Sequence, residues 1–198
     1  MGTADSEKDP RSLPTVNDAV ANQTVEVGDL TQKTKESVSD TTPLSEQQCD
    51  KELINTFAAH DIATGGGTTL AVIDTGISLS HPALESRLDM EQGRLFRNGQ
   101  NHAGQIPIRP NEDGEFGGDI IELPAGADID GHGPHVAGIA AGGGTDSGII
   151  GTAPDATIVP LRTLFYRQIS DYYSVKQITV ADTLHALDCA VEIEADVG

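Results

Sequence analysis

The sequence is poor in aromatic and basic residues. It has no tryptophan, four phenylalanines and three tyrosines among 198 residues, so aromatic side chains add little to any core. Only 12 Lys and Arg stand against 31 Asp and Glu, which gives a formal net charge of −19. A surface of that sign repels phosphate backbones and anionic headgroups, so we expect neither a nucleic-acid nor a membrane partner. Because salt screens repulsion within such a surface, adaptation to high salt is a further hypothesis.

Cysteines and long apolar runs are also scarce. Cys49 and Cys189 lie far apart in no metal-ligating pattern, and we expect two free thiols. No apolar run approaches the ~20 residues that span a bilayer. The N-terminus shows no basic segment followed by an apolar one, so no secretory signal is visible and the sequence assigns the protein no location. Met1, Gly2 and Ser6 formally fit a myristoylation pattern, which we interpret as a chance match.

Composition divides the chain into two parts. Residues 1–44 are rich in Asp, Glu, Ser, Thr and Lys and poor in large apolar groups. Such a segment buries too little surface to offset its ordering entropy, so we predict a mostly disordered acidic tail, with a short strand somewhere in 24–30. Residues 45–198 form the predicted domain.

The domain begins with a predicted helix. Ser45 and Gln48 form a capping box. Apolar residues then recur at helical spacing on one face: Cys49, Leu53, Ile54, Phe57 and Ala58. After a triple-glycine turn, residues 68–73 form a continuous apolar run with no polar alternation, which is typical of a strand buried on both faces of a parallel sheet.

A strand–helix rhythm continues along the chain. We predict a small-residue helix at 136–141, a strand at 157–161 that Pro160 weakens as a central strand, and a helix at 179–194. In the last helix an apolar stripe (Val180, Leu184, Leu187, Val191) lies opposite a polar one (Asp182, His185, Asp188, Glu192). We predict residues 77–129 to be loop-rich. The alternation predicts an α/β fold with a doubly wound, mainly parallel sheet and helices on both faces.

Two side chains are the candidates for chemistry. Asp74 ends an apolar strand, at the edge where open α/β sheets place their ligands. Its partly desolvated carboxylate needs a partner or a task, although capping the following turn would also satisfy it. His132 stands between two glycines at a helix start, and its near-neutral titration suits a general base. A hydroxyl nucleophile requires such a base and a carboxylate that orients it.

The segments AVIDTGI at 71–77 and DGHGPHVAGIAA at 130–141 resemble the Asp and His blocks of the subtilisin-like serine peptidases, in the same chain order. HPALESRL at 81–88 and GTAPDATIVPLR at 151–162 also resemble family segments, as does the stretch at 183–196. The resemblance covers about residues 45–198. It implies a subtilisin-like fold, endopeptidase activity on peptide or protein substrates, Asp74 as the orienting carboxylate and His132 as the general base.

The resemblance has two departures. Pro134 stands where the family has Thr, and a first helical turn tolerates it because its missing N–H has no intrahelical acceptor there. The family's oxyanion-hole Asn and its G-T-S-M-A block with the nucleophilic Ser do not occur in this sequence. Losing that Ser costs ~10⁶ in turnover. We therefore expect the C-terminal part of the domain to be missing and the chain alone to be inactive.

Other interpretations remain open at this point. The chain would be a non-catalytic peptide-binding or interaction relic if no Ser block accompanies it. Asp74-Thr75-Gly76 is also the signature of aspartic peptidases, which pair two such carboxylates. His132, His135, Asp128 and Asp130 are types that ligate metals, although their spacing fits no common pattern. By the resemblance His135 is structural, and the chemistry requires no cofactor. Structural calcium is compatible with the resemblance, but its ligands do not map onto the sequence.

Overall fold

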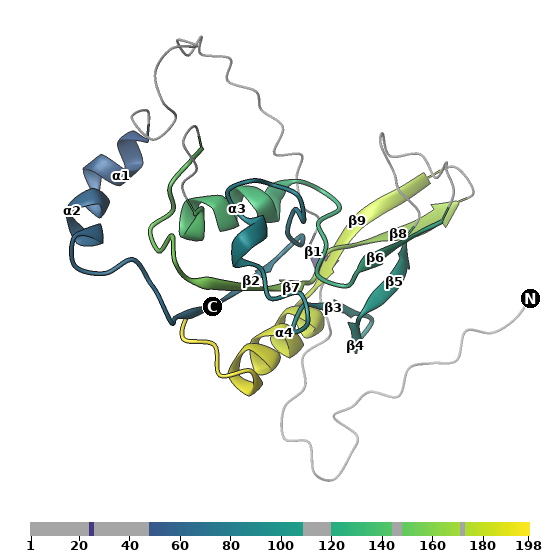
Figure 1. Ribbon diagram of the computed structural model, residues 1–198. Helices are drawn as coiled ribbons and strands as arrows, with labels where there is room; N and C mark the ends of the chain where they lie inside the picture. Colours follow the sequence, from purple (N-terminus) through teal and green to yellow (C-terminus); the bar gives the residue numbers. More distant parts are fainter. Residues whose placement is uncertain (1–23, 26–47, 109–119, 144–147, 171–172) are drawn as a thin grey trace, which may run out of the picture.

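The structure is a computed structural model that describes residues 24–25, 48–108, 120–143, 148–170 and 173–198 (Figure 1). The predicted disordered tail lies outside these residues, apart from the short strand β1 (Thr24–Val25), which falls within the predicted stretch 24–30. Ser45 of the predicted capping box also lies outside. Among the described helices, none is long and apolar enough to cross a membrane.

The core is a four-stranded sheet in the order β2-β7-β3-β4. The strands are β2 (Thr69–Asp74), β7 (Thr157–Arg162), β3 (Arg94–Arg97) and β4 (Gln100–Ala103). β2 and β7 pair in parallel over their whole length, and β3 runs parallel to β7, whereas β4 is antiparallel to β3. On the outer edge of β2, Leu70 forms a parallel bridge with Val197.

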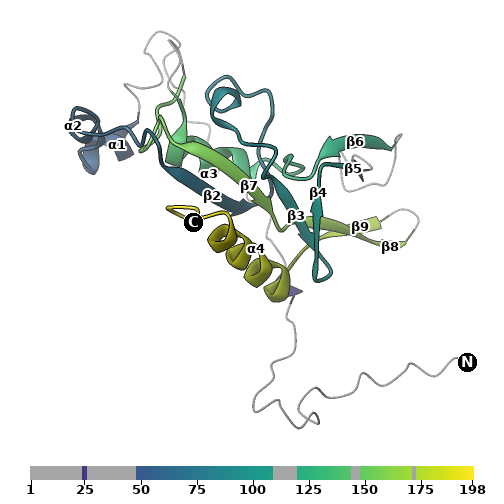
Figure 2. The same cartoon turned by 60° about the horizontal axis from the view of Figure 1, so that its bottom comes forward.

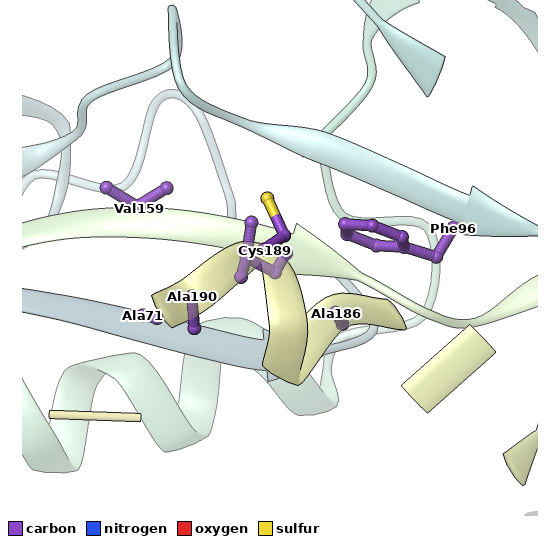
Figure 3. Close-up of a cluster of buried hydrophobic side chains, with 7 residues drawn as sticks. Ala71, Phe96, Val159, Ala186, Cys189 and Ala190 are labelled. Atoms are coloured by element: carbon purple, nitrogen blue, oxygen red, sulfur yellow. The ribbon is translucent and has the colours of Figure 1, made fainter. Parts of the chain in front are cut away.

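Helices cover both faces of this sheet, on opposite sides in Figures 1 and 2. A cluster of buried hydrophobic side chains that includes Val72 and Ile158 packs against α3 (His132–Ala141). Their chain neighbours Ala71 and Val159 point the other way and pack against α4 (Val180–Glu192), beside Cys189 (Figure 3). Because strand side chains alternate between faces, both faces of β2 are apolar, as the continuous run predicted. The α/β fold with helices on both faces is confirmed.

Pro160 nevertheless occupies the central strand β7, so the doubt it raised about this strand was wrong. Amide hydrogens alternate between the two edges of a strand, and Thr157 and Thr163 donate to Thr68 and Asp74 on the β2 side. Pro160, an odd number of residues from each, faces the other edge. There β3 pairs only with Leu161 and Arg162, so no ladder hydrogen bond is lost.

The helix predicted after Ser45 is two short helices, α1 (Cys49–Leu53) and α2 (Thr56–His60), separated by Asn55 with a left-handed φ of 59°. Its expected apolar face is exposed, with Leu53 87% accessible. Lys51 is buried instead. Its Nζ donates to Ile139 O at 2.7 Å and to Thr152 Oγ1 at 2.9 Å, so α1 docks through a polar anchor rather than an apolar face.

The apolar stripe of α4 is not the face that packs on the sheet. The four residues of its apolar stripe are exposed, and the helix packs through the opposite face: Asp182, Ala186, Cys189 and Ala190. Small side chains allow a closer approach to the sheet. Asp182 is buried because its carboxylate accepts hydrogen bonds from Gly99 N (2.8 Å) and Thr179 Oγ1 (2.6 Å). The first turn of α4 is thereby bonded to the turn between β3 and β4.

Short strands occupy the region expected to be loop-rich. Besides β3 and β4, it contains β5 (Gln105–Ile108), β6 (Ile121–Pro124) and the 3-10 turn η3 (Glu85–Arg87). β8 (Phe165–Ser170) and β9 (Tyr173–Thr179) form a hairpin that the sequence did not indicate, and β1 pairs with β9 to complete a three-stranded sheet.

Candidate active site

Asp74 is the last residue of β2, at the carboxyl end of the parallel sheet. Its Oδ1 accepts a hydrogen bond of 2.6 Å from the N–H of Thr75, so the carboxylate does cap the turn that follows the strand. The side chain keeps 14% of its accessible surface. Asp74 therefore lies at the end of the strand, as the sequence predicted.

His132 opens α3, directly after Gly131, whose φ of +108° suits glycine. Its Nδ1 lies 2.8 Å from Oδ1 and 2.9 Å from Oδ2 of Asp74. A carboxylate only accepts hydrogen bonds, so Nδ1 must carry the hydrogen and the neutral ring is left with an unprotonated Nε2. The imidazole is 37% exposed, so it is not enclosed in the core.

Two glycines allow the two segments to approach. A Cβ on Gly133 would lie 1.9 Å from Gly76 O, closer than any side chain tolerates. A Cβ on Gly76, whose φ is +112°, would lie 2.5 Å from Ala127 O. Only glycine fits at either position, and this close backbone contact sets the distance between Asp74 and His132.

Thr75 connects the same segments through its hydroxyl. Its Oγ1 accepts from the buried Gly133 N–H at 2.8 Å and donates to Asp128 Oδ1 at 2.6 Å. Burial raises the pKa of the Asp128 carboxyl, although its hydrogen bonds oppose the shift. The sequence indicated no role for Thr75 itself, and it indicated Asp128 only as a candidate metal ligand. The contacts of Thr75 with Asp128 and Gly133 join residues that are 53 and 58 positions apart, so no local sequence pattern could have indicated them.

A second set of charged groups supports the loop before His132. Arg162, in register with Asp74 on the neighbouring strand, donates from Nη1 to Ala127 O at 2.7 Å. Burial lowers its pKa to about 10. Lys176 on β9 forms an ion pair with Asp130, two residues before His132. The β8–β9 hairpin therefore contacts the loop that presents the imidazole.

The other candidate residues do not join the pair. In the described part of the chain, no three His, Cys, Asp or Glu side chains gather as a metal site would require, so the proposed set with Asp128, Asp130 and His135 is not formed. His135 is exposed on α3. Pro134 lies in the first turn of α3, where its missing N–H costs nothing. Cys49 and Cys189 are both free, as predicted.

Comparison with known proteins identifies the family. The sequence model of the Subtilase family matches residues 65–188, which is more than half of the chain. The chain is 33% identical over 115 residues to Subtilisin of Bacillus sp. (strain TA39), a match covering 58% of this chain and 22% of the relative. It is 32% identical over 121 residues to Thermitase of Thermoactinomyces vulgaris, covering 61% and 34%.

A solved structure supports the fold. The crystal structure of MycP1 from the ESX-1 type VII secretion system superposes with a TM-score of 0.50 at 19% identity, over 81% of this chain and 38% of that one.

The chain belongs to the subtilase family, as the Asp and His blocks indicated. It matches about a fifth to a third of the length of these two curated relatives.

Proposed function

We propose that this chain supplies the carboxylate and the general base of a serine endopeptidase that hydrolyses protein substrates. The observation that carries the proposal is the contact of His132 Nδ1 with both oxygens of Asp74, at 2.8 and 2.9 Å. Membership of the subtilase family and identity to named subtilisins support it.

Each residue has a distinct task in the proposed reaction. Asp74 fixes the ring orientation and the tautomer, and it stabilises the imidazolium that forms when the ring accepts a proton. His132 takes the proton of a serine hydroxyl through Nε2 as that hydroxyl attacks the peptide carbonyl, and later donates it to the leaving amine. The aspartic-peptidase alternative requires a second carboxylate beside Asp74, whereas here the imidazole occupies that place.

The nucleophile in this proposal comes from polypeptide outside the 198 residues. Ser147, Ser170 and Ser174 do not lie in a glycine-flanked block at a helix start, the context that the family uses. A C-terminal half of the domain would supply both the serine and an oxyanion donor, and removal of one such donor alone costs about 10²–10³ in turnover.

Casein hydrolysis tests the proposal. We expect the chain alone to hydrolyse casein no faster than His132→Ala, and to become active when combined with the C-terminal half of a close relative. Activity of the combined protein should fall at least about 10⁴-fold in Asp74→Asn and in His132→Ala, whereas His135→Ala, an exposed histidine of the same helix, should retain it.

Three results would contradict the proposal. Activity of the chain alone that phenylmethylsulfonyl fluoride abolishes, and that His132→Ala lacks, would place the nucleophile within these residues. Acid-optimal activity blocked by pepstatin would favour the aspartic mechanism. If the combined protein folds, binds peptides and yet hydrolyses none, the non-catalytic binding role is correct.

A further inference from the structure

A pocket of about 340 Å³ is lined by neither Asp74 nor His132, although its wall includes Arg162, the strand neighbour of Asp74. Its walls come from β3, β4, β5, β7, the start of β8 and nearby loops. Apart from β7, which runs back toward the helices, these strands gather at the end of the molecule remote from α1 and α2 (Figures 1 and 2). Most of the wall is apolar, including Ile106, Ile108, Ile120 and Phe165. Its size is within the range of small-molecule sites.

The charged side chains that line the pocket are both cationic. Arg97 and Arg162 line it together with His102 and Tyr166, and no described lining residue is acidic. This composition is the reverse of the chain as a whole, where acidic residues outnumber basic ones 31 to 12. Arg97 is two residues from Leu95 on β3, and His102 lies opposite Leu95 on β4. The two side chains therefore share one face of the β3–β4 hairpin, the face opposite Phe96 and α4.

Arg162 lacks the partners that a buried guanidinium needs. It is 1% exposed, its Nε has no hydrogen-bond partner among the described residues, and the one hydrogen bond that its side chain makes to them runs from Nη1 to Ala127 O. Burial and repulsion from Arg97 both lower its pKa, against attraction from Asp128. Neither Arg97 nor His102 makes a side-chain hydrogen bond or ion pair with the described residues. Asp128 attracts Arg162 but does not line the pocket, so two guanidinium groups share a largely apolar pocket whose described lining residues include no anion. An incoming anion would relieve this arrangement.

We propose that this pocket binds a carboxylate that carries an apolar body, with Arg97 and Arg162 holding the carboxylate and the isoleucine-rich wall covering the body. Guanidinium groups match the geometry of a carboxylate, and burial strengthens the resulting charge-assisted hydrogen bonds. A short fatty acid and the free C-terminus of a peptide that ends in an apolar residue share this chemistry. The site does not depend on the peptidase proposal.

Isothermal titration calorimetry at fixed ionic strength tests the site with two carboxylates, hexanoate and N-acetyl-L-leucine. The neutral counterparts are hexanamide and N-acetyl-L-leucinamide, and inorganic phosphate is the anion without an apolar body. We expect each carboxylate to bind at least about tenfold more tightly than its amide, and phosphate to bind more weakly than either carboxylate. Tighter binding of hexanoate points to a fatty acid, and tighter binding of N-acetyl-L-leucine points to a peptide C-terminus.

Variants of β3 locate the binding. Arg97→Gln removes a pocket guanidinium from an exposed position and should weaken both carboxylates about tenfold. Arg94→Gln is the matched control, because Arg94 is on the same strand but donates to Glu91 O and Gly93 O outside the pocket. Its affinity should stay within about twofold of the unchanged chain.

Three results would overturn the inference. They are equal affinity for carboxylate and amide, equal losses in Arg97→Gln and Arg94→Gln, and no saturable binding of either carboxylate by the folded chain. The comparison of carboxylate with amide needs no variant, so a variant that fails to fold does not remove the test.

Discussion

The Thr75 hydroxyl should contribute strongly to stability because it joins three segments around the candidate site. Thr75→Val removes the acceptor of the buried Gly133 N–H and the donor to Asp128 Oδ1. A buried donor left without a partner costs about 1–3 kcal/mol, and the loss of the second hydrogen bond adds about 1 kcal/mol. We therefore expect a loss of about 2–4 kcal/mol in the free energy of unfolding. At about 2–4 °C per kcal/mol for a chain of this size, Tm should fall by roughly 5–15 °C.

Urea unfolding followed by far-UV circular dichroism at pH 7 measures this loss, with Thr75→Ser as the control. Serine keeps the hydroxyl and lacks only a methyl group, so it should cost no more than about 1 kcal/mol. If Thr75→Val stays within about 0.5 kcal/mol of the unchanged chain, or if valine and serine cost the same, the hydroxyl does not join these segments.

Three further predictions concern charge. With a net charge of −19, Tm should rise steeply between 0.01 and 1 M KCl, as the Debye length falls from ~30 to ~3 Å; equal melts at the two concentrations would remove the high-salt hypothesis. Burial raises the pKa of Asp128 above its usual 3.8, so the folded state binds this proton more tightly than the unfolded state, and stability falls as pH rises from 3.8 through the folded-state pKa. Over that window Asp128→Asn should gain stability relative to the unchanged chain, and a difference independent of pH in urea unfolding would contradict this. Lys51→Met removes two hydrogen bonds from a buried ammonium and should cost about 2 kcal/mol or more, whereas Glu52→Gln, exposed on the same helix, should stay within about 0.5 kcal/mol.

The sequence predicted the central strands and the candidate pair because their signals are local. The run at 68–73 shows no polar alternation and is apolar at every position from Leu70 to Ile73, which is the pattern of a strand covered on both faces, and Asp74 follows it directly. His132 is marked by its flanking glycines, one of which Gly76 O approaches too closely for any side chain. The family blocks then placed both residues in one site, 58 positions apart in the chain.

Other features depend on contacts that no local pattern shows. Periodicity identified the apolar stripe of α4 but not the contact face, since the sheet accepts small residues there and Asp182 finds buried partners. In α1 a lysine docks the helix because Ile139 O and Thr152 Oγ1 are placed to accept its hydrogens. Thr75 and Arg162 act through bonds to distant segments. Their roles follow from the fold and could not be inferred from neighbouring residues.

The state of the His132 ring tests the central claim most directly. Long-range ¹H–¹⁵N NMR at about pH 9, well above the usual imidazole pKa of ~6.5, reports which nitrogen of the neutral ring carries the hydrogen. We predict the hydrogen on Nδ1, bonded to Asp74, with Nε2 free to act as a base, and a shift toward the Nε2–H tautomer in Asp74→Asn. A neutral ring protonated on Nε2 in the unchanged chain, or a tautomer that Asp74→Asn leaves unaltered, would contradict the assignment of this pair.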